Sequence, residues 1–203
     1  MKIICIGRNY ADHAKELKNE VPKEPVFFMK PDTALLKDNA PFYHPSFSND
    51  IHYEVELVIK ICKNGKTILP QFAHTYYEQI TVGIDFTARD LQQQCKEKGL
   101  PWEKAKAFDH SAVIGRFIPL KALENKEEIN FSLNLNNQLV QQGISNQMLF
   151  SVDQIIAYIS RFITLKTGDL IYTGTPSGVG PVKIGDKLTG FIQDRKMFDV
   201  YIK

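Results

Sequence analysis

Apolar and polar residues alternate along much of this chain, and a period of two is typical of strands that are buried on one face. The pattern predicts strands over residues 2–6, 26–29, 52–63, 80–87, 129–135, 138–142, 169–173, 187–192 and 196–202. Turn residues follow two of these strands, Asn64-Gly65 and Asn136-Asn137, and Asn-Gly is a strong hairpin signal. The chain is therefore expected to be rich in antiparallel strand pairs.

Helical periodicity is confined to a few short segments. It predicts helices from residue 10 to about 17, over 72–79 and 88–98, and from 151 to about 162. Asn9 is placed as the N-cap of the first helix, and Ser151 with Gln154 forms a capping box for the last. Because strands outnumber helices, the sequence predicts a strand-dominated mixed α/β fold, rolled or twisted, with short peripheral helices.

Composition narrows the class of protein. The 203 residues, 43% hydrophobic and 24% charged, are enough for one large domain with a substantial core. The net charge of +2 comes without a basic stripe, so no nucleic-acid partner is expected. Cys5, Cys62 and Cys95 have neither zinc nor disulfide spacing, which favours a reducing cytoplasm. The apolar start is too short for a signal peptide, and no segment has the length of a membrane span.

Three carboxylates interrupt two of the apolar segments. Glu54 and Glu56 are two residues apart, so in one strand both side chains would point to the same face. Asp85 lies within the apolar run 81–86, where Asp is disfavoured unless it has a compensating partner. Together these acids predict a site for a hard cation such as Mg²⁺, Mn²⁺ or Ca²⁺. The alternative for the Glu54–Glu56 pair alone is a solvated strand face.

Polar residues near these acids point to an anionic substrate. Arg89 and Gln92 lie three apart on one helical face that begins beside Asp85. The Arg guanidinium matches the geometry of a carboxylate. A surface ion pair between Asp85 and Arg89 is the alternative. His13 and Glu16 also share a helical face, as a general base and the group that orients it would.

Two further segments carry candidate chemistry. Lys106 lies between alanines, either as a solvated surface residue or as a cation that neutralises a developing enolate. Residues 173–181, Thr-Gly-Thr-Pro-Ser-Gly-Val-Gly-Pro, follow an apolar strand and could present backbone N–H groups and hydroxyls to an anion. The segment lacks the spacing of a P-loop or a dinucleotide fingerprint. A tight structural turn is the alternative.

Taken together, these segments resemble the fumarylacetoacetate hydrolase family, with a match from Gly7 to about Ile192. The motifs that carry the resemblance are Gly7-Arg-Asn-Tyr-Ala-Asp-His13, Phe28-Met-Lys-Pro31, Glu54-Val-Glu-Leu57, Asp85-Phe-Thr-Ala-Arg-Asp90, Gly99-Leu-Pro-Trp102, Ala105-Lys-Ala-Phe108 and Thr173-Gly-Thr-Pro-Ser-Gly-Val-Gly180. The most similar subgroup is that of the single-domain acylpyruvases, which also act as oxaloacetate decarboxylases.

The resemblance implies a rolled mixed β-sandwich in a single catalytic domain over residues 1–203, with a strand and a lid helix within residues 1–25. It implies a homodimer that acts on a small 2-oxo or 2,4-dioxo acid. The implied roles are as follows: Glu54, Glu56 and Asp85 bind Mg²⁺ or Mn²⁺; His13 and Glu16 activate water; Lys106 stabilises enolate charge; Arg89, Gln92, Gly174 and Thr175 bind the substrate.

Three functions are consistent with these residues. The first is hydrolysis of the C–C bond of acylpyruvates to pyruvate and a carboxylic acid, with decarboxylation of oxaloacetate through the same enolate. The second is an isomerase or tautomerase of 2-hydroxy-dienedioic or 2-oxo acids, which needs no water; the intact His13–Glu16 pair favours hydrolysis. The third is a non-catalytic module that binds small acids.

Overall fold

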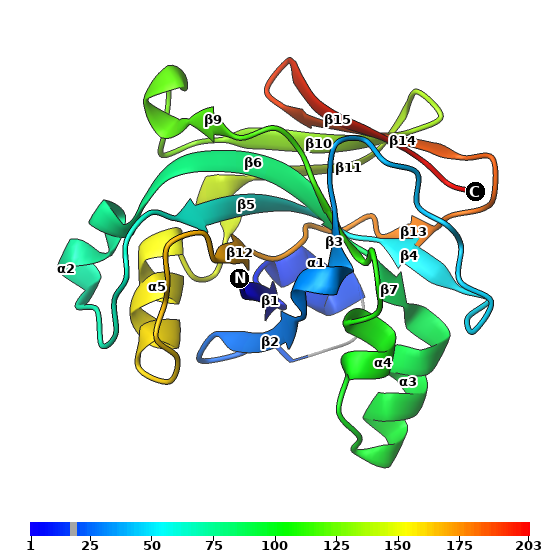
Figure 1. The fold of residues 1–203 in the computed structure, drawn as a ribbon, viewed down its shortest axis with the longest axis horizontal. Helices are drawn as coiled ribbons and strands as arrows, with labels where there is room; N and C mark the ends of the chain where they lie inside the picture. Colours follow the sequence, from blue (N-terminus) through cyan, green and yellow to red (C-terminus); the bar gives the residue numbers. More distant parts are fainter. Residues whose placement is uncertain (17–19) are drawn as a thin grey trace.

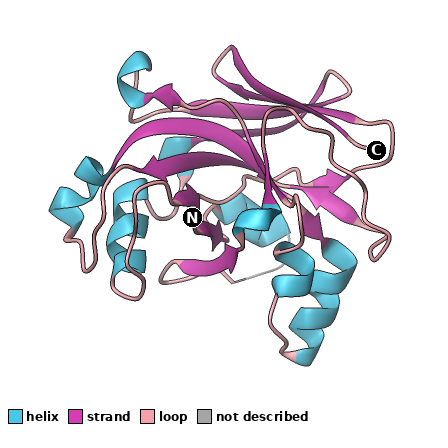
Figure 2. Ribbon diagram, viewed as in Figure 1, coloured by secondary structure: helices cyan, strands magenta, loops and turns pink. Residues whose placement is uncertain are grey.

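Strands dominate the computed structural model, which describes residues 1–16 and 20–203 (Figure 1). They form an eight-stranded, a four-stranded and a three-stranded sheet. Figure 2 shows strands running across the molecule, with short helices on its left and lower right and near the centre of the view. The predicted strand-dominated mixed α/β fold with a rolled sheet and peripheral short helices is confirmed.

The eight-stranded sheet is mixed and strongly curled. Its order is β2-β1-β12-β5-β6-β8-β3, with β9 also paired to β6. Two pairs are parallel, β1 with β12 and β3 with β8. The strands are β1 (Ile3–Gly7), β2 (Val26–Lys30), β3 (Leu35–Leu36), β5 (Val55–Ile61), β6 (Tyr77–Asp85), β8 (Ala112–Ile114), β9 (Ile118–Pro119) and β12 (Leu170–Tyr172).

The two smaller sheets are antiparallel. The four-stranded sheet packs over β5 and β6 (Figure 1) and has the order β11-β10-β14-β15, with strands β10 (Asn130–Leu135), β11 (Gln138–Ile144), β14 (Lys187–Ile192) and β15 (Arg195–Tyr201). The three-stranded sheet contains β4 (Ile51–Tyr53), β7 (Thr87–Ala88) and β13 (Gly180–Pro181). Asn136 and Asn137 turn β10 into β11 with positive φ angles of 51° and 68°, as the sequence predicts.

The helices are short. They are α1 (Ala11–Glu16), α2 (Pro70–Ala73), α3 (Arg89–Lys98), α4 (Glu103–Lys106) and α5 (Val152–Ser160), with 3-10 turns at Asp32–Ala34, His74–Tyr76, Leu120–Ala122 and Ser145–Gln147. The capping box of Ser151 and Gln154 is confirmed, and Gly99 ends α3 in the left-handed conformation. Within the described part of the chain, no helix combines the length and apolar character that a membrane crossing requires.

The core lies between the curled sheet and the four-stranded sheet. Val55, Leu57 and Ile59 of β5 contribute to it, and Val58 faces a smaller cluster on the other side of the strand. This is the alternation expected from the sequence. Leu133 of β10 is fully buried in the same core. The acid-bearing ends of β5 and β6 are thus fixed by apolar packing along the rest of each strand.

Some local expectations are wrong. Residues 52–63 do not form one strand: the chain leaves the three-stranded sheet after Tyr53 and enters the eight-stranded sheet at Val55. Asn64-Gly65 does not form a tight hairpin, because Gly65 pairs with Leu165 instead. The region 72–79 is helical only as far as Tyr76, and β6 begins at Tyr77.

The expected N-cap at Asn9 is also replaced by a tertiary contact. The Asn9 amide donates to the carbonyl oxygens of Thr173 (2.8 Å) and Phe150 (3.0 Å), and its side-chain oxygen accepts from Phe150 N–H (2.8 Å). Asn9 therefore ties the segment before α1 to the loop after β12. Residue 17, at the expected end of this helix, lies outside the described residues.

Candidate active site

Three buried carboxylates converge where β5 and β6 meet the three-stranded sheet. Glu54 occupies the crossing point between β4 and β5, Glu56 is in β5, and Asp85 is the last residue of β6. Their side chains each offer an oxygen within 4.8 Å of the others, and the residues are only 5%, 1% and 1% exposed. The register that pairs Val55 with Ile84 brings the two strands together at this height. The structure thus assembles the acid cluster that the sequence predicts, although the two glutamates do not share one continuous strand.

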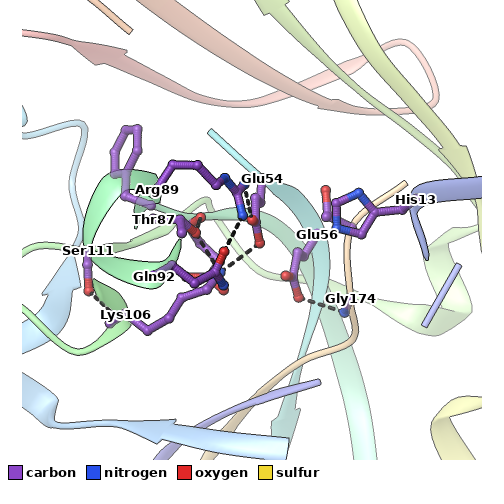
Figure 3. A network of polar contacts seen from close by, with 12 residues as sticks. His13, Glu54, Glu56, Thr87, Arg89, Gln92, Lys106, Ser111 and Gly174 are labelled. Carbon is purple, nitrogen blue, oxygen red and sulfur yellow. Dashed lines mark hydrogen bonds and ion pairs between the residues drawn. The ribbon is translucent and has the colours of Figure 1, made fainter. Parts of the chain in front are cut away.

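Three cations pair with two of the three acids, and Figure 3 shows two of these cations, Lys106 and Arg89, beside Glu54. Lys106 Nζ is 2.8 Å from Glu54 Oε2 and 2.7 Å from Asp85 Oδ2. Arg89 Nη2 is 2.6 Å from Glu54 Oε1. Lys30 Nζ is 2.7 Å from Asp85 Oδ1. Three acids and three cations leave the cluster close to neutral overall. Buried charges are stable when they are paired in this way.

Lys30 is a site residue that the sequence reasoning missed. Its side chain is fully buried and donates to Ser111 Oγ (2.8 Å), to the Ser111 carbonyl (3.1 Å) and to the carbonyl oxygen of Lys106. These contacts fix the start of β8 and the end of α4 relative to Asp85. A lysine inside an otherwise apolar strand end, followed by Pro31, is the sequence feature that marks it.

The ionisation of the cluster follows from burial and charge. Burial would raise the pKa of Glu54, but Lys106 and Arg89 outweigh it and hold that pKa well below its usual range. Burial would lower the pKa of Lys106, but Asp85 and Glu54 raise it instead. Burial raises the pKa of Glu56, and the negative charges of Asp85 and Glu54 raise it further. Glu56 is therefore the acid least compensated by the side chains around it.

The donor set fits a hard divalent cation. Its oxygens are all carboxylate, which favours Mg²⁺ or Mn²⁺ over the metals that prefer sulfur or imidazole ligands. Burial first, and then the charges of Asp85 and Glu54, raise the pKa of Glu56, and a cation bound to this carboxylate would compensate its charge. Among the described residues this is the one cluster of three acid, His or Cys side chains with mutually accessible ligand atoms.

His13 and Glu16 form a hydrogen-bonded pair beside the acids. His13 Nδ1 lies 3.1 Å from Glu16 Oε2, and Glu16 Oε1 accepts from the Gly178 N–H at 3.0 Å. His13 is buried and lines the same pocket as the acids (Figure 3). With Nδ1 engaged by Glu16, Nε2 is the ring nitrogen left to face water or a ligand.

The loop after β12 closes one side of the pocket. Gly174 has a φ of +101°, and a Cβ at this position would lie 2.6 Å from the Asn9 Cβ. The Gly174 N–H donates to Glu56 Oε2 at 2.6 Å. Two backbone N–H groups of the loop, those of Gly174 and Gly178, therefore bind the protein's own carboxylates. These two N–H groups of the loop thus position Glu56 and Glu16.

The remaining predicted residues lie in the same pocket. Gln92 accepts from Arg89 Nη1 at 2.6 Å, and Thr175, which is 3% exposed, lines the same pocket. All the predicted site residues line this pocket except Glu16 and Gly174. These two hydrogen-bond to residues that do line it, Glu16 to His13 and Gly174 to Glu56. A much larger hollow of about 820 Å³ lies elsewhere, beside Tyr77 and Asp153, but it does not contain the acid cluster. Size alone therefore does not mark the site.

The sequence of residues 2–203 matches the family model described as the C-terminal domain of fumarylacetoacetate (FAA) hydrolase. The chain belongs to the fumarylacetoacetate hydrolase family. The resemblance seen in the sequence motifs is thereby confirmed.

Within the fumarylacetoacetate hydrolase family, the relatives carry several activities. The chain is 44% identical to a mitochondrial oxaloacetate decarboxylase of Dictyostelium discoideum, over 100% of this chain and 94% of that protein. It is 43% identical to the mitochondrial oxaloacetate tautomerase FAHD1 of Mus musculus, over 92% and 84%. It also matches the structure of fumarylpyruvate hydrolase from Pseudomonas aeruginosa in complex with Mn²⁺ and pyruvate, with a TM-score of 0.93, 38% identity and coverage of 100% and 89%.

Proposed function

We propose that this protein is a divalent-metal-dependent enzyme that hydrolyses a C–C bond of acylpyruvates, releasing pyruvate and a carboxylic acid. The observation that carries the proposal is the position of the His13–Glu16 pair on the same pocket as three buried carboxylates. The likeness to a fumarylpyruvate hydrolase with Mn²⁺ and pyruvate supports it. Family membership alone does not choose among the activities of the relatives, and the His13–Glu16 pair favours hydrolysis.

Glu54, Glu56 and Asp85 are the residues that would hold Mg²⁺ or Mn²⁺. A bound divalent cation would polarise the oxygens of a 2-oxo acid and stabilise the negative charge of its enolate. The charge of the site supports this assignment. Three acids facing Lys30, Lys106 and Arg89 leave little net charge. With a divalent cation the pocket would carry a charge of about +2, which suits a dianionic acid.

The other residues have distinct proposed roles. His13, oriented by Glu16, takes a proton from water through Nε2, and the resulting hydroxide attacks the C4 carbonyl. The C3–C4 bond then breaks, its electron pair stays with the pyruvate fragment as an enolate, and protonation of C3 gives pyruvate. Lys106 stabilises the enolate charge. Arg89, Gln92 and Thr175 bind the acid groups, and the Gly174 N–H, which already donates to Glu56, positions that carboxylate.

A second candidate is a reaction on oxaloacetate, either keto–enol isomerisation or decarboxylation. The enolate and the residues that stabilise it would be the same, but no water attacks. One finding favours this candidate, the similarity to relatives with 43% and 44% identity whose names specify oxaloacetate as the substrate.

A panel of acetylpyruvate, fumarylpyruvate and oxaloacetate, with Mg²⁺, Mn²⁺ or a chelator, tests the proposal. Hydrolysis releases pyruvate and the matching acid in equal amounts. Tautomerisation changes the enol absorbance without releasing pyruvate, and decarboxylation releases CO₂. Failure of the metal-loaded protein to cleave either acylpyruvate would refute the hydrolase. Oxalate binding without turnover of any of these acids would favour a non-catalytic module.

A histidine variant separates the dyad from the metal site. His13→Ala should lower hydrolysis by roughly 10²- to 10⁴-fold, the contribution typical of a general base, while Mn²⁺ still binds. His74→Ala is the matched control, because His74 is exposed and lies beside the large hollow away from the acids. Equal loss of hydrolysis and of Mn²⁺ binding in His13→Ala would mean that His13 has a structural role.

Three further expectations are retained as proposals: that residues 1–203 form a single catalytic domain in which α1 closes over bound ligand, that the protein is a homodimer, and that it acts in the cytoplasm. Sedimentation of the purified protein tests the homodimer. A monomer at micromolar concentration would refute it.

A further inference from the structure

A buried glutamine on the four-stranded sheet reaches the proposed active site. Gln141 lies in β11 opposite Leu133, and it is only 2% exposed. Its Oε1 accepts from the Val55 N–H at 2.9 Å, between the two glutamates. Its Nε2 donates to Thr175 Oγ1 at 2.9 Å and to the Pro176 carbonyl at 3.0 Å. One side chain thus joins the strand of the acids to the loop that carries Thr175.

These partners fix which end of the amide faces which group. The Val55 N–H can only donate, so the atom facing it must be the side-chain oxygen. The Pro176 carbonyl can only accept, so the atom facing it must be the NH₂ group. Both protons of that group are then used, one on Pro176 and one on Thr175. The orientation of Gln141 is therefore determined by two independent neighbours, Val55 and Pro176.

The orientation of Gln141 sets the role of the Thr175 hydroxyl. Since Thr175 Oγ1 accepts a hydrogen bond from Gln141, its own proton is left for another acceptor. The nearest protein acceptor recorded for it is the Pro176 carbonyl at 3.4 Å, which Gln141 already serves at the shorter distance of 3.0 Å. Thr175 is buried against the pocket that contains Glu54 and Glu56.

We propose that Gln141 is a positioning residue that makes the Thr175 hydroxyl a dedicated hydrogen-bond donor, and that this selects a carboxylate over a carboxamide at that end of the substrate. A carboxylate presents an accepting oxygen in either orientation. A carboxamide accepts only through its one oxygen, and in the flipped orientation its NH₂ protons would face the hydroxyl proton. The inference rests on the proposed function to the extent that Thr175 contacts the acid. The inference specifies what the Thr175 hydroxyl binds: a carboxylate oxygen of the ligand, which accepts from this neutral donor.

Binding of oxalate and of oxamate in the presence of Mn²⁺, measured by calorimetry, tests this inference without depending on which reaction the protein performs. In Gln141→Glu, the carboxylate retains an acceptor for Val55 but offers no donor, so the Thr175 hydroxyl turns to donate to it. Oxalate affinity should fall by roughly 10- to 100-fold, the loss expected for one hydrogen bond to a charged group. The preference for oxalate over oxamate should shrink by a similar factor.

Two controls separate positioning from charge or damage. Gln142→Glu places the same new charge one residue away at an exposed position and should leave both affinities unchanged. Thr175→Val should reproduce the reduced preference for oxalate over oxamate, and Thr175→Ser, which keeps the hydroxyl, should retain the wild-type preference. In the Thr175→Val background, Gln141→Glu should cause little further loss, because both changes remove the same contact.

Several outcomes would overturn the inference. An unchanged oxalate preference in Gln141→Glu, or losses that add fully in the double variant, would show that Gln141 does not act through Thr175. If Gln141→Glu does not fold, the uncharged Gln141→Met, of similar length, takes its place. An unchanged oxalate preference, or losses that add fully with Thr175→Val, would overturn the inference in that variant too. Wild-type protein that binds no oxalate with Mn²⁺ would overturn the proposed function, and this inference with it. Wild-type binding with unaffected variants would overturn this inference alone.

Discussion

Replacement of Lys30 by Met should destabilise the metal-free protein strongly. Lys30 Nζ lies 2.7 Å from Asp85 Oδ1, and both side chains are buried. Removing one partner of a buried ion pair leaves the other charge uncompensated, at a cost of about 3–5 kcal/mol. Lys106 remains 2.7 Å from the second oxygen of Asp85, which favours the lower part of that range. For a protein of this size the loss corresponds to a fall in Tm of roughly 6–20 °C.

Urea denaturation in chelator and in Mn²⁺ is the assay. Because a divalent cation would supply part of the missing positive charge, Mn²⁺ should stabilise Lys30→Met more than it stabilises the wild type. Lys196→Met is the control, since Lys196 also pairs with a carboxylate, Asp199 at 2.8 Å, but is exposed, and its loss should change stability little. A Lys30→Met protein as stable as the wild type in chelator would refute the reasoning on buried charge. An equal gain from Mn²⁺ in both proteins would refute the link to the metal site.

Three other predictions follow from the site. Gly174→Ala should cost several kcal/mol in urea denaturation, because the new Cβ would lie 2.6 Å from that of Asn9 at a φ of +101°; unchanged stability would contradict the close approach. Burial and neighbouring carboxylates raise the pKa of Glu56, so Mn²⁺ must displace its proton on binding. Below that pKa, Mn²⁺ affinity should increase by up to about tenfold for each unit by which the pH rises. Calorimetry in two buffers of different ionisation enthalpy would detect the released proton, and an affinity independent of pH would argue against this coupling. Glu16→Gln should reduce hydrolysis more than Mn²⁺ affinity, because it weakens the orientation of His13 and leaves the three acids untouched; parallel losses in steady-state kinetics and metal titration would count against a dyad.

The sequence predicts the acid cluster well because each acid interrupts an apolar run. Glu54, Glu56 and Asp85 are all buried and close together, as their positions among Val, Leu and Ile indicate. The expectation that one strand carries both glutamates is only partly correct. A period of two within one strand places both on one face, but the chain changes sheets at Glu54. Local periodicity does not reveal a change of sheet, because each half of the segment alternates normally.

Lys30 and Gln141 were missed for a different reason. Each acts through partners more than 50 residues away in sequence, Ser111 for Lys30 and Val55 for Gln141. Lys30 belongs to the motif Phe28-Met-Lys-Pro31, but that motif alone indicates no chemistry, and Gln141 belongs to none of the motifs. What marks both is a polar side chain at an inward position of a strand, and Gln141 occupies such a position across from the buried Leu133. An inward polar residue needs a partner, but only the fold shows which one.

Strand β12 has a consequence for the order in which the protein can assemble during translation. It lies between β1 and β5, so it is the strand that joins the segment carrying His13 to the strand carrying Glu56. Residues 3–5 can pair with β2 early, but their pairing with the rest of the sheet must wait for residues 170–172. A nascent chain released before β12 would carry all three acids and the dyad, but no strand would join the β1–β2 pair to the β5–β6 pair. The ribosome therefore has to deliver most of the polypeptide before the pocket can exist, and the earliest-made strand is among the last to dock.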